Sequence, residues 1–177
     1  MMQTLFKKIY AHGLANWAVV LQGMIGIHKN LGQLPPSCVQ FFANSELEKI
    51  TLNDERIEQI VALSIDSYMP SSERRFLIEK INGNRTMDML HAQKVWRVAE
   101  LEKTLQEVDS DPIYGLIKLS EFWSNWGWPS DAPPSMHSEE NSLSEREYHS
   151  AEHYKNSLQE HQEWLKNELT FLKNFSR

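Results

Sequence analysis

Two histidines and a glutamate near the C-terminus have the spacing of a zinc site. His149, Glu152 and His153 follow the order H-x-x-E-H, in which two ligands four residues apart on a helix share a face and the glutamate activates water. A catalytic zinc also requires a third protein ligand. None is evident in the 24 residues that follow His153. We therefore interpret the motif as a solvated helix face and keep a zinc-dependent hydrolase as the alternative function.

Three tryptophans lie close together beside a proline-rich stretch. Trp123, Trp126 and Trp128 fall within six residues, and Pro129 follows directly. One interpretation is that these large rings fill the end of a helical bundle. The other is that Trp126 or Trp128 is an exposed anchor of a protein interface, where tryptophan is enriched.

Negative charge gathers immediately after these tryptophans. Residues 1–128 carry 13 Lys/Arg and 15 Asp/Glu, whereas residues 129–163 carry two basic and eight acidic residues. The acidic residues are Asp131, Glu139, Glu140, Glu145, Glu147, Glu152, Glu160 and Glu163. Such a segment repels nucleic acid and anionic membranes and attracts basic proteins. We therefore expect a protein partner rather than nucleic acid, a membrane or a small molecule.

Four of the seven histidines fall in or beside this acidic segment: His137, His149, His153 and His161. Neighbouring carboxylates raise the pKa of an imidazole because they stabilise its charged form. We therefore expect raised histidine pKa values, a less negative segment near pH 6 and weaker binding of a basic partner there.

The remaining motifs indicate structure rather than chemistry. Gly23 and Gly26 have G-x-x-G spacing but lie in an apolar helical pattern, so we interpret them as small residues that allow close helix packing. Cys38 is the only cysteine, which suits a reducing compartment, and we expect a buried structural thiol in a cytoplasmic protein. No phosphate-binding glycine loop or nucleophile elbow occurs. We expect no enzyme activity and no cofactor.

The elements that must position these residues are helices. Apolar residues recur three to four apart in successive segments, and capping residues or prolines precede several of them. The expected helices cover residues 5–13, 16–30, a segment starting at 35–36, a segment after 53–54, a segment after 71–72, 86–108, a segment from Asp111–Pro112 through Phe122, and a long helix from Ser142 or Ser144 to about Phe175. The Pro/Ser-rich acidic stretch near 127–141 is expected to be a loop. The pattern predicts an all-α, single-domain bundle over residues 1–177, with about seven to eight helices and a long C-terminal helix.

A family resemblance adds a function to this fold. The small acidic helical chain resembles bacterial immunity proteins, the antidotes of contact-dependent and related polymorphic toxins. The segment from Asp111-Pro112-Ile113-Tyr114 to Gly127-Trp128-Pro129 is also similar to a stretch in bacterial helical families with an aromatic-Gly-aromatic-Pro turn. The resemblance implies a cognate toxin as partner, and many such toxins are nucleases with basic clefts. The residues expected to bind it are Trp126, Trp128, Asp131, Glu139, Glu140, Glu145, Glu147 and Glu152.

Overall fold

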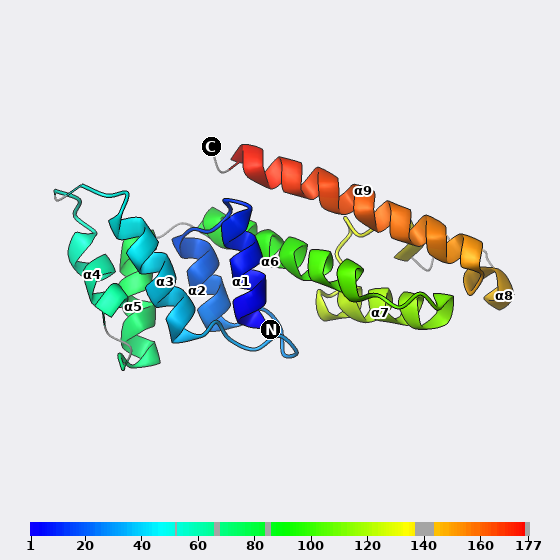
Figure 1. Cartoon of the computed structure of the whole chain (residues 1–177), viewed down its shortest axis with the longest axis horizontal. Coiled ribbons are helices and arrows are strands. Elements are labelled where there is room, and N and C mark those ends of the chain that lie inside the picture. The colour runs from blue at the N-terminus through cyan, green and yellow to red at the C-terminus, as the bar shows by residue number, and fades with distance from the viewer. Residues whose placement is uncertain (52, 66–67, 84–85, 137–143, 176–177) are drawn as a thin grey trace. The chain divides into compact units, whose positions relative to one another are not determined.

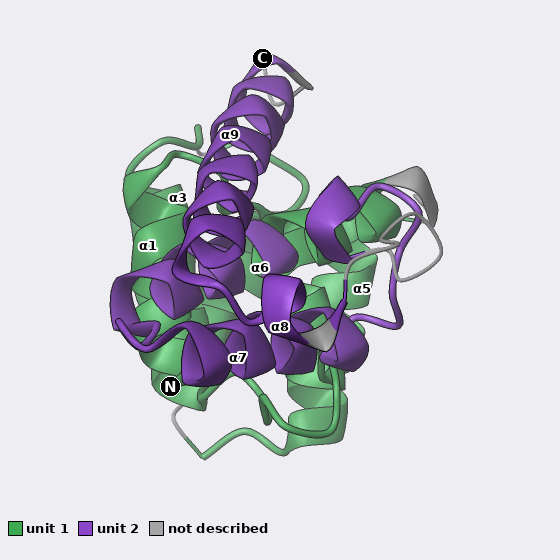
Figure 2. Cartoon of the chain, turned by 90° about the vertical axis from the view of Figure 1, so that its right-hand side faces the viewer, with its two compact units in different colours: residues 1–96 green, residues 97–177 purple. Residues whose placement is uncertain are grey.

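A computed structural model describes residues 1–51, 53–65, 68–83, 86–136 and 144–175. Throughout these ranges the regular elements are helices and no strand occurs, as the sequence predicts (Figure 1). Residues 1–96 and 97–177 form two compact units (Figure 2), each of which is described by itself below. The expectation of one domain over residues 1–177 stays a prediction. Within the described part of the chain, none of the helices combines the length and apolar character that crossing a bilayer requires.

The described residues of the first unit form five helices and the start of a sixth. They are α1 (Met2–Ala11), α2 (Trp17–Ile25), α3 (Pro36–Leu47), α4 (Ile57–Ile65), α5 (Ser71–Asn82) and the first part of α6 (Thr86–Glu107). Helix α3 packs on α4, and α5 packs on both α2 and α4. Local signals start these helices: the Asn16 side chain accepts a hydrogen bond from the Val19 amide, and Pro36 is the first residue of α3.

The core of the first unit confirms the packing role of Gly23. Trp96 is fully buried and donates its indole N–H to the Val19 carbonyl at 2.9 Å. A Cβ at position 23 would lie 2.6 Å from Cζ2 of Trp96 and 3.1 Å from Cβ of Leu34. Only glycine lets the Trp96 ring approach the α2 backbone this closely. Cys38 is also buried, and burial raises the pKa of its thiol, in agreement with a structural role.

Helix α2 is shorter than the sequence suggests. The apolar pattern predicts a helix from Asn16 to Asn30, but α2 ends at Ile25. Gly26 follows with φ 107°, outside the helical region, and its carbonyl accepts a hydrogen bond from the Gln22 side chain. A residue without a Cβ adopts this conformation without strain, so Gly26 stops the helix although the apolar pattern continues to Ile27. A Cβ at position 26 would meet no described atom within 4 Å, so the expectation that Gly26 allows close helix packing is wrong.

The second unit contains the rest of α6, α7 (Pro112–Asn125), the short 3₁₀ helix η1 (Pro134–Met136), α8 (Glu145–Tyr148) and α9 (Ala151–Phe175). Its buried cluster joins residues of all these elements except α8 and centres on Trp123. Other members include Leu101 of α6, Met136 of η1 and Tyr154 of α9. Helix α7 begins as predicted, because the Asp111 side chain accepts hydrogen bonds from the amides of Ile113 and Tyr114.

The predicted long C-terminal helix is present as α9 and ends at Phe175, but the expectation that it starts at Ser142 or Ser144 is wrong, because α8 and α9 are separate. The Ser144 hydroxyl and the Glu147 carboxylate form a reciprocal cap at the start of α8. The Ser150 hydroxyl then accepts a hydrogen bond from the His153 amide and starts α9. Each serine caps its own helix, and His149 and Ser150 lie in the turn between the two.

Candidate partner-binding surface

The three clustered tryptophans occupy three different environments. Trp123 is fully buried, and Trp126 is half-buried and donates its indole N–H to Glu100 Oε2 at 2.9 Å. Trp128 is 46% exposed and has φ 51° in the turn that follows α7. The interpretation that these rings fill the core is therefore confirmed for Trp123. The exposure of Trp128 is compatible with an interface anchor, which stays a prediction.

Asp131 is held by a buried arginine. Arg97 Nη1 and Nη2 donate to the two carboxylate oxygens of Asp131 at 3.1 and 2.6 Å, and only 7% of the Arg97 side chain is exposed. The guanidinium carbon also lies 5.8 Å from the ring centre of Trp123 and 5.1 Å from that of Trp164. Asp131 therefore balances a buried charge, and the negative potential that it offers a partner is reduced.

His161 lies in the same core and differs from the expectation of a raised pKa. It is fully buried, and burial lowers the pKa of its imidazole, although Glu160 and the Ser157 carbonyl act in the opposite direction. Trp123 Nε1 donates to His161 Nε2 at 2.8 Å. The sequence pattern placed His161 among carboxylates but did not show that the surrounding core keeps it neutral. His137 lies outside the described residues.

Helices α7 and α9 pack in parallel, as two pairs of residues show. Gly115 and Tyr154 are in close contact near the N-terminal ends of the two helices, and Trp123 and His161 are bonded further along both of them. The Tyr154 hydroxyl also donates to the carbonyl of Asp109, just before α7. Both N-termini therefore lie at one end of the unit, on the right of Figure 1, together with α8. We call this the shared N-terminal end.

Exposed carboxylates gather at the shared N-terminal end. Asp109 and Asp111 precede α7, Glu147 lies in α8 and Glu152 lies in the first turn of α9, all four exposed. Some of them also stabilise the helices: Asp111 caps α7, and hydrogen bonds from the Ser144 hydroxyl and amide lower the pKa of Glu147. An ionised carboxylate has about four acceptor positions, so these local bonds leave the negative charge available to a partner.

An apolar patch, which the sequence did not reveal, borders these carboxylates. Ile113, Tyr114 and Ile117 of α7 are 47%, 66% and 48% exposed. The opposite side of the same turns, with Gly115, Leu116 and Leu119, is buried instead. One feature of the sequence could have indicated this patch. Residues 113–119 hold more apolar side chains than one helix face can bury, so some of them must be exposed.

The structure separates the predicted binding residues into two groups. Trp126, Trp128 and Asp131 follow the C-terminal end of α7, whereas Glu147 and Glu152 lie at the shared N-terminal end. The length of α7, about 20 Å at 1.5 Å per residue, separates the two groups. Glu139 and Glu140 lie outside the described residues, as does the side chain of Glu145. The tryptophan anchor and the described glutamates therefore do not form one continuous patch.

The zinc alternative required His149 and His153 to share one helix face. His149 instead lies in the turn before α9, and both imidazole rings pack against Tyr148, with ring centres 5.2 and 4.9 Å from it. Among the described residues, no three or more His, Cys, Asp or Glu side chains lie together in an arrangement that could hold a metal ion. The spacing that suggested a shared face assumed a helix that the caps at Ser144 and Ser150 interrupt.

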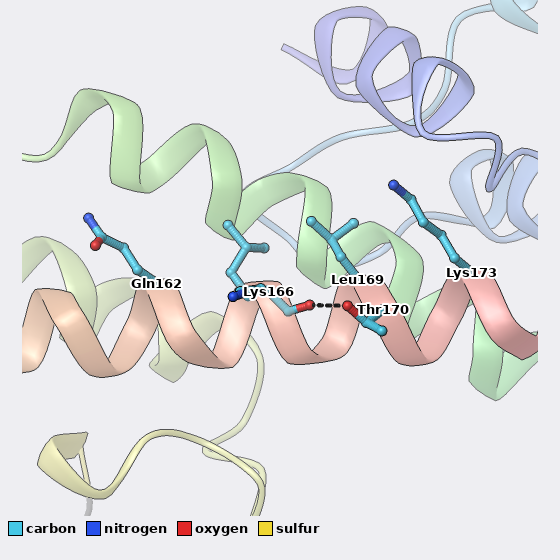
Figure 3. Close-up of a pocket in the computed structure, with 6 residues that line it drawn as sticks. Gln162, Lys166, Leu169, Thr170 and Lys173 are labelled. Carbon is cyan, nitrogen blue, oxygen red and sulfur yellow. Dashed lines mark hydrogen bonds between the residues drawn. The ribbon is translucent and has the colours of Figure 1, made fainter.

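A hollow of about 340 Å³ lies along the C-terminal half of α9 (Figure 3). Its lining residues are Gln162, Leu165, Lys166, Leu169, Thr170 and Lys173. The Thr170 hydroxyl donates to the Lys166 carbonyl of its own helix at 2.8 Å. The charged residues among those that line it are Lys166 and Lys173.

The two units differ in charge. Residues 1–96 carry 10 Lys/Arg and 9 Asp/Glu, whereas residues 97–177 carry 8 Lys/Arg and 15 Asp/Glu. The formal charges are therefore +1 and −7. The acidity of the protein resides in its second unit, which extends the charge asymmetry seen in the sequence to include Asp109 and Asp111.

Comparison with known proteins identifies one family. The family model described as an uncharacterized protein conserved in bacteria, DUF2247, matches residues 6–169. The match extends across both compact units. No curated protein and no solved structure matches the chain.

Proposed function

We propose that this chain, which belongs to the bacterial family described above, is an immunity protein that binds and neutralises a basic toxin domain, most simply a nuclease. The observation that carries the proposal is the charge of −7 on residues 97–177 beside +1 on residues 1–96. A uniformly acidic protein would be explained by solubility alone. Concentration of the charge on one unit favours recognition of a positively charged partner.

The physical basis is charge complementarity. A nuclease holds the phosphates of its substrate in a basic cleft, and an acidic protein that presents carboxylates to this cleft competes with the nucleic acid. Long-range attraction accelerates the encounter. Glu147 and Glu152, which are exposed at the shared N-terminal end, support such an encounter surface. Asp131 contributes less, because Arg97 already neutralises it.

A co-expression experiment tests the proposal. The C-terminal domain of the protein encoded by the neighbouring gene is tested as the toxin, and it is expressed together with the wild-type chain or with the triple variant Glu145→Lys, Glu147→Lys and Glu152→Lys. We expect wild type to restore growth and the triple variant to protect less, because charge reversal slows association. Full protection by the triple variant would contradict a role for these glutamates, and failure of the wild type to protect would remove the proposal itself.

A matched control separates local charge from net charge. Glu48, Glu58 and Glu73 are exposed residues of the first unit, so their replacement by lysine changes the net charge of the chain by the same amount. We expect this control variant to protect like wild type. Equal loss of protection by both variants would indicate that solubility or net charge, rather than a surface of the second unit, is responsible.

A further inference from the structure

The exposed face at the start of α7 combines apolar side chains with acidic neighbours. Ile113 and Ile117 are four residues apart and therefore lie on one face of the helix, with Tyr114 beside them. Each of the three is about half exposed or more. Because Leu116 and Leu119 already bury the inner face of this helix, the outer residues are not needed for the core of the unit.

Carboxylates border this apolar face on one side. Asp109 and Asp111 are exposed and directly precede the first turn of α7. The contact of Tyr154 with Gly115 and with the Asp109 carbonyl brings the start of α9 to the same place, with Glu152 exposed two residues before Tyr154. An apolar centre with a charged rim is the usual anatomy of a protein interface.

We propose that Ile113, Tyr114 and Ile117 form the centre of the surface on which the basic toxin domain docks, with Asp109 and Asp111 as its acidic rim. This assignment rests on the proposed function and names the site where it acts. Tyrosine is among the residues that dominate binding energies, and its ring offers a face on which an arginine of the partner can stack. The partner surface is therefore an apolar patch surrounded by arginine or lysine.

The charge of this surface favours the basic toxin domain over a second copy of the chain as its binding partner. In a symmetric dimer through this face, both copies would bring Asp109 and Asp111, together with the negative charge of their second units, into one interface. Like charges that meet across an interface cost free energy and disfavour the association. A basic protein gains attraction from the same carboxylates. Charge complementarity therefore favours a basic partner over self-association.

Binding kinetics test the two parts of the surface separately. The full-length wild type and its variants are titrated against the same purified C-terminal domain that the co-expression experiment tests as the toxin. We expect Ile113→Ser, Tyr114→Ala and Ile117→Ser together to raise Kd by roughly thirtyfold or more, mainly through faster dissociation, because an anchor is lost. We expect Asp109→Asn with Asp111→Asn to slow association, most strongly at low salt. Asparagine preserves the cap of α7.

The control uses apolar residues of the first unit. Phe76 and Leu90 are 63% and 61% exposed, so Phe76→Ser with Leu90→Ser removes comparable exposed apolar area and should leave Kd unchanged. Helical circular dichroism checks that each variant is folded, and Tyr114→Arg provides a single-site variant that adds repulsion without emptying the patch.

The outcomes distinguish the site from the function. If the Ile113/Tyr114/Ile117 variant binds with wild-type affinity and the wild type protects, the assignment of this docking surface is wrong and the proposed function stands. Failure of the wild type to bind or protect overturns both. Sedimentation that shows a wild-type dimer, dissociated by the same three substitutions, assigns the face to a second copy and also overturns the docking proposal.

Discussion

Trp123 donates its indole N–H to Nε2 of His161 at 2.8 Å inside the core of the second unit. An indole nitrogen can only donate, so Nε2 of the imidazole must accept, and the proton of a neutral ring is on Nδ1. Nδ1 lies 2.6 Å from the carbonyl oxygen of Ser157, which can accept it. The bond partners therefore require a neutral His161 with one tautomer, and a second proton on Nε2 would break the bond from Trp123.

This relationship predicts an acid-sensitive fold. Burial lowers the pKa of His161 in the folded protein below its ordinary value of 6.5, so the unfolded chain binds the proton more tightly. Stability is then complete above about pH 6.5 and is lost as the pH falls from there through the lowered pKa. We expect the free energy of unfolding, measured by urea titration, to decrease over this range.

His161→Gln isolates this contribution from the other six histidines. The glutamine side chain does not titrate, so the difference in unfolding free energy between wild type and variant should be largest at pH 8 and should shrink toward pH 5. A difference that stays constant with pH would contradict the assignment of the acid sensitivity to this side chain.

The contact between Gly115 and Tyr154 predicts an unusual response to alanine. In an open helix, Gly→Ala stabilises by about 1 kcal/mol. A Cβ at position 115 would lie 2.2 Å from both Cζ and the hydroxyl oxygen of Tyr154, so the ring must move away from the Asp109 carbonyl. We expect Gly115→Ala to reduce the free energy of unfolding by about 1–3 kcal/mol, measured by denaturant titration.

A second background tests the cause. A leucine side chain in place of Tyr154 lacks the three atoms that meet the added Cβ, so Gly115→Ala should become neutral or stabilising in a Tyr154→Leu protein. Equal destabilisation in both backgrounds would mean that the backbone conformation, rather than the tyrosine ring, requires glycine.

Arg74 predicts a stabilising substitution. It is 2% exposed, and its Nε and Nη2 atoms have no hydrogen-bond partner among the residues that the structure describes. A buried polar group without a partner costs about 1–3 kcal/mol. We expect Arg74→Met, which replaces the guanidinium with an unbranched apolar side chain, to raise the free energy of unfolding by a similar amount.

The neighbouring arginine is a matched control for this substitution. Arg75 is 53% exposed and pairs with Glu79 at 2.7 Å on the surface of the same helix, so Arg75→Met should change stability by less than about 0.5 kcal/mol. If Arg74→Met lowers the free energy of unfolding by more than Arg75→Met does, the Arg74 guanidinium has stabilising partners in the folded protein and the prediction is wrong.

Asp131 is predicted to act on folding more than on binding. Removal of its charge leaves the buried guanidinium of Arg97 without its counter-charge. Because Asp131 itself is 42% exposed, we expect Asp131→Asn to cost about 1–2 kcal/mol of stability and to leave toxin affinity within a few-fold of wild type. Thermal unfolding and binding titration measure the two effects. If the melting temperature is unchanged and the affinity for the toxin is lost, Asp131 acts in partner binding and not in folding.

Local signals in the sequence predict where most helices begin. Asn16, Pro36 and Asp111 each act within a few residues of their own position, so the caps and first turns that they predict are present. The same reasoning missed the break between α8 and α9, although Ser144 and Ser150 can both cap a helix. The apolar pattern of the segment continues across the break, so it did not indicate that two separate helices begin there.

The candidate surface was harder to predict because it depends on tertiary contacts. Asp131 pairs with Arg97, 34 residues away, and nothing near Asp131 in the sequence reveals this partner. The exposure of Ile113 and Ile117 depends on which face of α7 meets α9, and the close approach of Tyr154 to Gly115 determines that face. The distribution of charged residues along the sequence located the acidic region, but it did not show that the predicted binding residues lie at two different ends of the second unit.

The parallel arrangement of α7 and α9 has a consequence for how this family can diversify. The positive ends of two helix dipoles lie together, and the acidic side chains near them stabilise both helices whether or not a toxin is present. Selection for folding alone therefore maintains the acidity of this end. Ile113, Tyr114 and Ile117 contribute little to the core, so under the proposed function relatives that bind different toxins should differ there while keeping the same negative rim.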